Sequence, residues 1–305
     1  MTKRILLFPG QGSQYLGMGK KCSESHSGSK NLLQEANEVL GFDLSEMMWN
    51  GPEAILNATE NTQPALFVTS LMAMAWLKER EIQFDFVAGH SLGEYSALCA
   101  AGVFSFADGL KLVRLRGQLM AKAGEARPGA MSAILGLDRE QLELALEKSA
   151  SAGTVVAANF NSSSQIVISG EKKAVEAAKV FCMEAGAKKV VRLPVSGAFH
   201  SPLMDYAVSG LRDGLQGVLF STPKVPVITN VDAKVETDPE MLKSNLLRQL
   251  TAPVRWVESM QGVVSLGASE GYEVGSGKIL MGLLRGITRD IKVFPMENPE
   301  DLPVN

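Results

Sequence analysis

Residues 84–103 read FDFVAGHSLGEYSALCAAGV, and the character of the sequence changes twice along them. Phe84–Ala88 is a short apolar run typical of a buried strand, and a turn containing Gly89 separates it from an apolar helix. A strand, a tight turn and a helix in this order are typical of an α/β protein with a parallel sheet. This stretch therefore predicts the fold class.

The flanking parts of the chain continue this alternation. Ile5–Phe8 predicts another buried strand ending in a glycine-rich turn, and the polar run SESHSGS at 23–29 predicts a loop. We expect helices over Thr62–Arg80, Ser201–Gln216, Pro239–Leu250, Val254–Leu266 and Gly277–Ile287. We expect further strands over Lys224–Val231, Gly271–Val274 and Ile291–Phe294.

The middle of the chain has a different order of elements. We expect strands over Ala130–Leu137, Thr154–Phe160, Gln165–Ser169 and Lys189–Pro194, and helices over 138–149, capped by Asp138, and 171–185. This β-α-β-β-α-β order is that of a ferredoxin-like unit. We therefore predict a large α/β domain formed by residues 1–126 and 198–305, with a small α+β subdomain at 127–197 inserted into it.

The composition excludes several classes of protein. The 305 residues are 46% hydrophobic and 21% charged, and 30 basic against 33 acidic residues, without long runs, argue against nucleic-acid or membrane-surface binding. There is no apolar run long enough for a membrane span, and the N-terminal apolar stretch is too short for a signal peptide. Three scattered cysteines, Cys22, Cys99 and Cys182, argue against disulfides or a zinc site, so we expect a cytoplasmic protein without a metal.

The turn at 89–93 fits the pattern G-x-S-x-G. Two glycines allow a turn tight enough to expose the Ser91 hydroxyl at the start of a helix. The backbone N–H of Leu92 would then point at the oxyanion that forms when Ser91 attacks a carbonyl group. Ser91 is therefore the candidate nucleophile.

A nucleophilic serine needs a base, and the chain has three histidines. His26 lies in the predicted loop, and the turn directs His90 away from Ser91. His200, just before a predicted helix, is either a helix-entry residue or the base. A candidate nucleophile without a rival base favours the second interpretation. No acidic residue in a recognisable context completes a hydrolytic triad; the available ones are Asp205, Asp213 and Asp232.

The stretch LKLVRLRGQLM at 110–120 carries an arginine on its apolar face. At about 100° per residue, Arg116 lies within the apolar arc, whereas Arg114 lies on the opposite, solvated side. A buried guanidinium needs an anion, and its planar fork suits a carboxylate. That carboxylate belongs either to an internal Asp or Glu or to a substrate.

Gln11 follows the first predicted strand and is a second polar candidate at the same sheet edge. Its surroundings do not form a nucleotide-binding loop, because Tyr15 replaces the third glycine of G-x-G-x-x-G and no G-K-[ST] follows.

Five ordered motifs resemble those of the malonyl-CoA:acyl-carrier-protein transacylases of bacterial fatty acid synthesis. They are FPGQGSQ (8–14), GHSLGEYSAL (89–98), LVRLRGQLM (112–120), GAFHS (197–201) and RQLTAPVRW (248–256). The resemblance spans Phe8 to about Ile287 and implies a hydrolase-like α/β domain with a parallel sheet and an inserted ferredoxin-like subdomain.

The resemblance also implies a role for each candidate. Ser91 would carry the malonyl ester, His200 would be general base and acid, and the main-chain carbonyl of Gln249 would orient the histidine. Arg116 would hold the malonyl carboxylate. Two backbone donors, those of Gln11 and Leu92, would form the oxyanion hole.

The implied reaction is ping-pong transfer of malonyl from coenzyme A to the phosphopantetheine thiol of acyl carrier protein, without a further cofactor. Phe199 resembles the residue found in malonyl-selective relatives. We expect a monomer, with a basic rim for the acidic carrier protein; candidates are Lys188, Lys189 and Arg192. The segment ANFNSSSQ departs from the family pattern, and its Asn159 and Asn161 are interpreted first as turn residues.

Three alternatives remain from the sequence. A stand-alone acyltransferase that serves a polyketide synthase would keep every residue named above. A serine esterase or thioesterase would use Ser91 and His200 but would not need Arg116. A non-catalytic carrier-binding module would need none of them.

Overall fold

The large sheet is built around β1 (Lys3–Phe8) and β2 (Phe86–Gly89), which pair in parallel. Phe8 lies opposite Gly89, so both strands end at the same edge of the sheet. The computed structural model describes residues 2–302. Within them the strand order is β10 (Lys292–Met296), β9 (Ala268–Val274), β1, β2, β7 (Val227–Ile228) and β8 (Val235–Glu236), and only β8 is antiparallel to its neighbour.

The helices of the large domain occur both before and after the small subdomain. They are α1 (Lys20–Ser25), α2 (Ser27–Leu40), α3 (Leu44–Asn50), α4 (Glu53–Leu56), α5 (Thr59–Glu79), α6 (Gly93–Ala100), α7 (Phe106–Ala126), α10 (Val208–Gln216), α11 (Pro239–Gln249), α12 (Trp256–Ser265) and α13 (Ile279–Arg285). Two short 3₁₀ segments accompany them, η2 (Pro202–Ala207) and η3 (Pro299–Asp301).

Most predicted elements are confirmed, with three corrections. The loop predicted at 23–29 is wrong, because α1 ends and α2 begins there and the His26 side chain caps α2 by accepting from Ser29 N at 3.0 Å. The helix predicted from Ser201 starts as the 3₁₀ segment η2. The strand predicted at 224–231 is reduced to β7.

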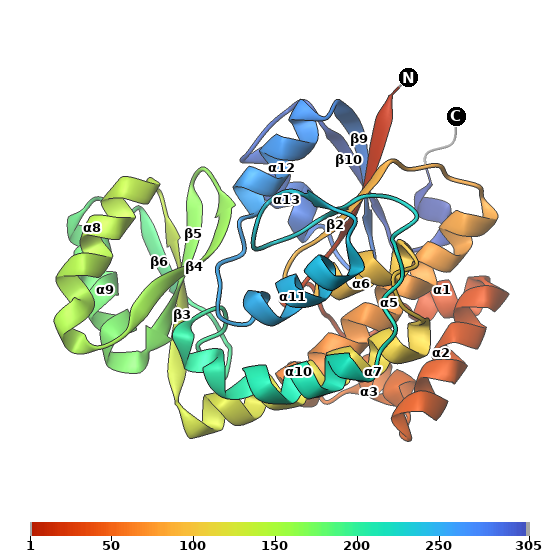
Figure 1. The fold of residues 1–305 in the computed structure, drawn as a ribbon, viewed down its shortest axis with the longest axis horizontal. Helices are drawn as coiled ribbons and strands as arrows, with labels where there is room; N and C mark the ends of the chain where they lie inside the picture. The colour runs from red at the N-terminus through yellow and green to blue at the C-terminus, as the bar shows by residue number, and fades with distance from the viewer. Residues whose placement is uncertain (1, 303–305) are drawn as a thin grey trace.

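Helices cover both faces of the large sheet. Leu6 and Phe8 point into a core shared with α5, α6 and α7, whereas Ile5 and Leu7 point into a second core with α12 and α13. Because both faces are buried, β1 is a continuous apolar run and not an alternating one. Figure 1 shows α12 and α13 grouped apart from α1, α2 and α5.

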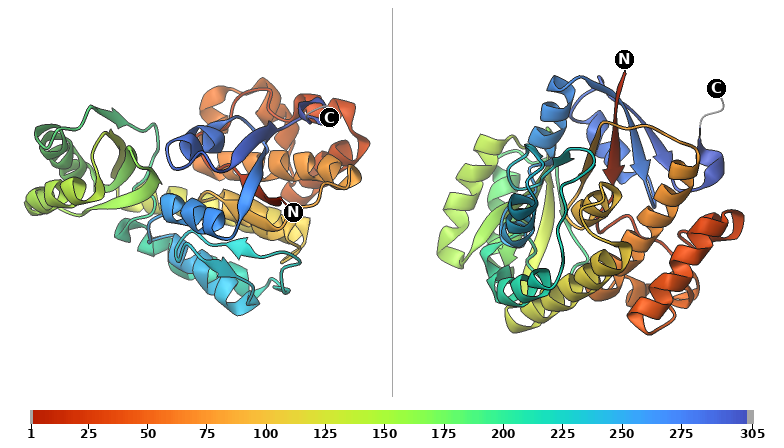
Figure 2. Two further views of the ribbon diagram at one scale, coloured as in Figure 1. Left: turned by 90° about the horizontal axis from the view of Figure 1, so that it is seen from above. Right: turned by 45° about the vertical axis from the view of Figure 1, so that its right-hand side comes forward.

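The small subdomain forms a second, antiparallel sheet. Its elements are β3 (Gly129–Leu135), α8 (Arg139–Ser149), η1 (Ala150–Ala152), β4 (Val155–Ser162), β5 (Gln165–Glu171), α9 (Lys172–Glu184) and β6 (Lys189–Arg192). The strand order β4-β5-β3-β6 confirms the ferredoxin-like arrangement, and Asp138 caps α8 as predicted. Figure 2 shows this sheet and its two helices set beside the large domain. The boundaries at residues 126/127 and 197/198 stay a prediction.

Backbone hydrogen bonds along β4 join the small subdomain to the large domain. Phe160 N donates to Val254 O at 2.9 Å, and Val254 N donates to Ala158 O at 2.9 Å. Just after β4, Ser163 N donates to Gly286 O at 3.3 Å. The strand that borders the large domain is therefore held by main-chain contacts, which are insensitive to side-chain replacement.

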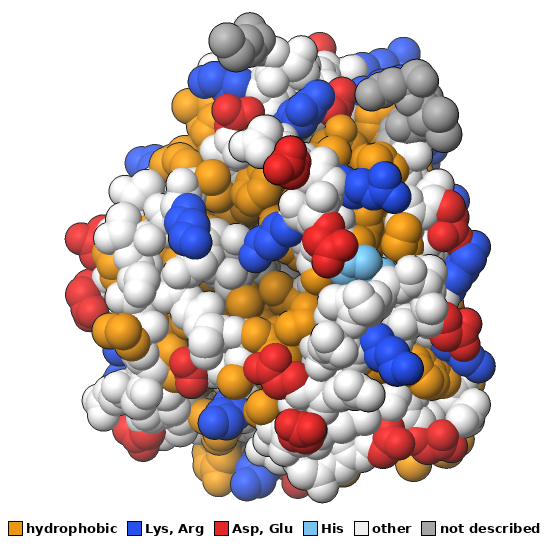
Figure 3. All heavy atoms as spheres, turned by 90° about the vertical axis from the view of Figure 1, so that its right-hand side faces the viewer, with side chains coloured by type: hydrophobic (Ala, Val, Ile, Leu, Met, Phe, Trp, Pro, Cys, Tyr) orange, Lys and Arg blue, Asp and Glu red, His pale blue; other side chains and the backbone are white. Residues whose placement is uncertain are grey.

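In residues 2–302 no helix is both long enough and apolar enough to cross a membrane. Acidic and basic side chains are interspersed on the face shown in Figure 3. This agrees with the near-balanced charge of the sequence.

Candidate active site

The turn at residues 89–93 between β2 and α6, called the elbow below, holds Ser91 in a left-handed conformation, with φ of 53°. A Cβ added at Gly89 would lie 1.9 Å from the Gly93 carbonyl carbon, and one added at Gly93 would lie 2.0 Å from Phe8 O. Neither position therefore accepts a larger residue. The two glycines of the motif are required because backbone passes directly against backbone.

Replacing Gly93 with alanine is expected to lower the free energy of unfolding by about 3 kcal/mol, because the added methyl group overlaps the backbone of β1. Urea unfolding measures this change. Gly282→Ala in α13 is the matched control, since nothing lies within 4 Å of its added Cβ. That control should change stability by less than about 1 kcal/mol, in the stabilising direction. Equal stability of Gly93→Ala and the unmodified protein would contradict the close approach.

Ser91 and His200 are brought together although they are far apart in sequence. Ser91 Oγ lies 2.7 Å from His200 Nε2, and His200 Nδ1 lies 2.8 Å from the main-chain oxygen of Gln249. Because a carbonyl oxygen only accepts, Nδ1 carries the hydrogen and Nε2 accepts from the serine hydroxyl. The histidine is thus set in the tautomer of a general base.

The charge state of His200 follows from its surroundings. The residue is only 3% exposed. Burial, and next the Arg116 charge, lower the pKa of His200 to about 3. At neutral pH the imidazole is uncharged and able to take a proton.

A histidine NMR titration checks this charge state. We expect the His200 ring signals to keep their neutral-form positions from pH 8 down to about pH 5, because the folded protein disfavours the imidazolium. A His200→Gln variant assigns the signals by their disappearance. A midpoint near the ordinary histidine pKa of about 6.5 would contradict the burial argument.

Arg116 lies beside this pair and is 1% exposed. Its Nη1 donates to Gln63 Oε1 at 2.8 Å, and its Nη2 donates to Gln249 Oε1 at 3.0 Å and to Ser91 Oγ at 3.2 Å. Among residues 2–302 it forms no ion pair. The internal carboxylate that the sequence left open is therefore not its partner.

Gln11 and Leu92 line the same pocket as Ser91 and His200. The Gln11 side chain accepts from Thr59 Oγ1 at 2.9 Å, which links the loop after β1 to the start of α5. In the described part of the chain neither residue's backbone N–H has an acceptor, so both remain available as donors. This placement suits an oxyanion hole.

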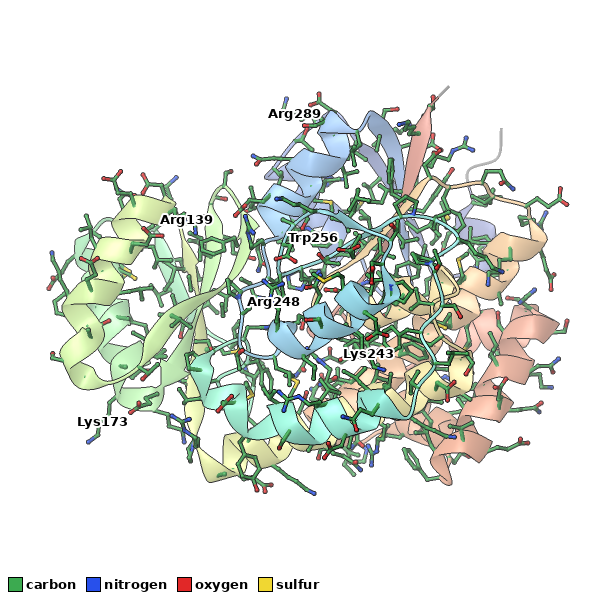
Figure 4. All side chains as sticks on the ribbon, in the orientation of Figure 1. Arg139, Lys173, Lys243, Arg248, Trp256 and Arg289 are labelled. Atoms are coloured by element: carbon green, nitrogen blue, oxygen red, sulfur yellow. The ribbon has the colours of Figure 1, made fainter. Side chains whose placement is uncertain are left out.

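The pocket is a cavity of about 130 Å³ lined by residues of both the large domain and the small subdomain. Part of its lining is apolar and consists of Met120, Met131, Val167, Leu193, Val195 and Phe199. In Figure 4 the labelled Arg248 and Trp256 mark the two ends of the segment that carries Gln249 and runs toward the small subdomain. The space admits a small acyl group.

Asn159 and Asn161 are strand residues, so their interpretation as turn residues is wrong. Both belong to β4, and the turn follows at 163–164. Asn161 Oδ1 lies 2.8 Å from His90 Nε2, which links the small subdomain to the elbow. The His90 ring is bonded to Asn161 and Ser91 to His200, which agrees with the prediction that His90 is directed away from Ser91, and burial lowers the pKa of His90. Both asparagines line the pocket.

Arg114 is also not the solvated residue that was predicted. Its Nη1 donates to Glu60 O at 2.6 Å and to Asn61 Oδ1 at 2.7 Å, and its guanidinium lies 5.2 Å from the Phe42 ring centroid. The side of α7 opposite Arg116 therefore packs on the start of α5.

Three polar residues of the site were missed in the sequence. Asn230 Oδ1 accepts from Ser91 N at 2.7 Å, and its Nδ2 donates to Gly89 O at 2.7 Å, so it fixes the elbow. Gln63 Oε1 accepts from Arg116 Nη1, and Glu94 Oε2 accepts from the Gln249 side chain at 2.7 Å. A charged residue inside an otherwise apolar helix was the available signal for Glu94, whereas Gln63 follows four polar residues and offers no such signal.

The basic candidates for carrier binding lie on or next to the edge strand β6. Lys188, Lys189 and Arg192 are exposed, and Arg192 Nη1 lies 3.2 Å from Glu176 Oε1. The chain continues from Arg192 to Leu193, which lines the pocket.

Elsewhere in the described chain, no group of three or more His, Cys, Asp or Glu side chains is placed to hold a metal ion. All three cysteines are buried free thiols.

Comparisons with known proteins identify the family of this chain. Residues 5–277 match the family model of the acyl transferase domain, which defines the class of protein. The malonyl CoA-acyl carrier protein transacylase of Bacillus subtilis is 44% identical over 303 residues, covering 99% of this chain and 96% of that protein. The chain belongs to the malonyl CoA-acyl carrier protein transacylase family.

Solved structures of this family share the fold. An acyl carrier protein S-malonyltransferase from Vibrio cholerae superposes with a TM-score of 0.95 at 43% identity, covering 99% of both chains. A malonyl-transacylase in complex with a type II polyketide synthase acyl carrier protein superposes with a TM-score of 0.96 at 40% identity, covering 99% of this chain and 98% of that one. The predicted α/β class, with a parallel sheet and a second antiparallel sheet, is confirmed.

Proposed function

We propose that this enzyme moves a malonyl group from coenzyme A to the phosphopantetheine thiol of acyl carrier protein through an ester on Ser91. The observation that carries the proposal is Arg116, a buried cation that forms no ion pair within residues 2–302 and lies 3.2 Å from the serine oxygen. A malonyl group is small and brings its own carboxylate to this cation. An esterase would have no use for this arginine.

The first half-reaction follows from the hydrogen bonds. Ser91 Oγ attacks the thioester carbon while its proton passes to His200 Nε2, and Gln249 O stabilises the resulting imidazolium through Nδ1–H. The N–H groups of Gln11 and Leu92 receive the oxyanion. Collapse breaks the carbon–sulfur bond, and the leaving thiolate takes the proton from His200.

The second half-reaction reverses these steps with another thiol. The carrier's thiol gives its proton to His200 and its sulfur attacks the Ser91 ester. Arg116 holds the malonyl carboxylate throughout and takes no part in bond making.

Further features of the chain fit the same proposal. The enzyme would act in the cytoplasm as a monomer, with the coenzyme A thioester as substrate and no additional cofactor. The exposed Lys188, Lys189 and Arg192 would attract the acidic carrier protein. The residues named would serve a carrier protein of polyketide synthesis equally well.

Intact-protein mass spectrometry tests this proposal. After incubation with malonyl-CoA, we expect the protein mass to rise by one malonyl group, and addition of the pantetheine-loaded carrier protein should return it to the unmodified value. The carrier protein should gain the same mass. Failure to form the adduct, or release of free malonate without the carrier, would contradict transfer.

A further inference from the structure

Glu94 is a fully buried carboxylate that the transfer steps do not use. It is 0% exposed and lies in the first turn of α6, a helix whose residues are all buried. A buried carboxylate without a cation or strong donors is costly. Its partners therefore indicate what it does.

One oxygen of Glu94 makes both of its hydrogen bonds. Oε2 accepts from Gln249 Nε2 at 2.7 Å and from Asn230 N at 3.0 Å. Burial raises the pKa of Glu94 to about 7, and these two donors favour its ionised form. The carboxylate thus faces the side chain of the residue whose main chain orients His200.

The Gln249 side-chain amide joins Glu94 to Arg116. Its Nε2 also donates to Ser91 O at 3.1 Å, while its Oε1 accepts from Arg116 Nη2 at 3.0 Å. A flipped amide would set its oxygen against the carboxylate and its NH₂ against the guanidinium. Both contacts are unfavourable, so a single orientation satisfies the two charged neighbours.

This arrangement leaves Arg116 held but not neutralised in direct contact. Its two amide partners, Gln63 and Gln249, are uncharged. The carboxylate lies one amide further away, where it balances the charge without occupying the guanidinium fork. A substrate carboxylate can therefore bind directly to the guanidinium of Arg116.

We propose that Glu94 is a positioning residue for malonyl transfer, which fixes the Gln249 amide and through it the guanidinium of Arg116. The inference rests on the function proposed above and adds a residue that sets selectivity without touching the substrate.

Glu94→Gln tests the proposal, because it keeps the size of the side chain and removes the charge that fixes the amide. The readout is the ratio of kcat/KM for Ser91 acylation by malonyl-CoA to that by acetyl-CoA. We expect the ratio to fall by about 5- to 20-fold, mainly through the KM for malonyl-CoA, as for a weakened charged hydrogen bond. A residue that only supports the fold would affect both acyl groups equally, so an unchanged or increased ratio overturns the proposal.

A double-mutant cycle separates this route from others. In an Arg116→Ala background, Glu94→Gln should leave the ratio unchanged within about two-fold, because the side chain it positions is gone. A further fall in that background would overturn the proposal.

Glu273→Gln is the matched control. Glu273 is also 0% exposed, and burial raises its pKa to about 7, but it accepts from the Leu280 and Met281 N–H groups of α13. This control should leave the ratio unchanged even where stability falls, and a fall in its ratio equal to that of Glu94→Gln would overturn the proposal.

Glu94→Asp serves if Glu94→Gln does not fold. This variant keeps the charge, but its side chain is one methylene group shorter, so the carboxylate lies farther from the Gln249 amide. The malonyl to acetyl ratio should therefore also fall, and an unchanged ratio overturns the proposal. The two proposals fail separately. A folded wild-type protein without a malonyl adduct contradicts the function, whereas a normal adduct with an unmoved ratio contradicts only the role of Glu94.

Discussion

Replacing Ser91 with alanine is expected to abolish the malonyl adduct and to lower transfer to carrier protein by on the order of 10⁶-fold, the usual cost of losing a serine nucleophile. The serine oxygen is the atom that His200 Nε2 activates at 2.7 Å, and no other hydroxyl oxygen is bonded to that nitrogen among the described residues. Intact-protein mass and a steady-state transfer assay measure the two effects.

A matched variant separates this result from damage to the fold. Ser209 is exposed on α10 and has no hydrogen-bond partner for its side chain in residues 2–302, so Ser209→Ala should keep full activity. Unfolding curves of both variants should match that of the unmodified protein. A malonyl adduct on Ser91→Ala would show that another residue carries the acyl group.

Arg116→Ala should change which acyl group is transferred. Malonyl-CoA loses the partner of its carboxylate, and we expect its kcat/KM to fall by about 10²- to 10³-fold, equivalent to about 3–4 kcal/mol. Acetyl-CoA has no carboxylate, and its rate should stay the same or rise. The assay is Ser91 acylation by each thioester under single-turnover conditions.

Arg114→Ala, two residues earlier on α7, is the control. It removes hydrogen bonds to Glu60 O and Asn61 Oδ1, so we expect a loss of stability of about 1–3 kcal/mol. The ratio of malonyl to acetyl rates should not change, because this guanidinium is on the opposite side of the helix. Malonyl transfer that survives Arg116→Ala would contradict the role assigned to Arg116.

Sequence reasoning located the elbow because its requirement is local. The chain must pass from a strand to a helix within a few residues here. The residues that make this possible, Gly89, Ser91 and Gly93, are close together in the sequence and form a recognisable motif. The ferredoxin-like unit was likewise predictable from the order of its strands and helices. The buried position of Arg116 followed from helical periodicity.

The remaining features depend on contacts between distant segments. The partners of Asn230 and Glu94 lie more than 100 residues away, so the sequence around each residue does not reveal what it binds. Arg114 was predicted to be solvated because a helical projection of α7 does not include other segments. In the structure the start of α5 contacts this side chain. The run at 23–29 was misread since two helix ends meet there and both are polar.

The order of the elements along the chain has a consequence for the protein during its synthesis. The nucleophile is made at residue 91, but the carbonyl that orients its base comes from Gln249, and β1 is completed on its other side only by β9 at 268–274. A nascent chain on the ribosome therefore exposes the serine long before the serine is activated. A chain that ends before Gln249 lacks the carbonyl that orients His200, so its serine is not activated in this way.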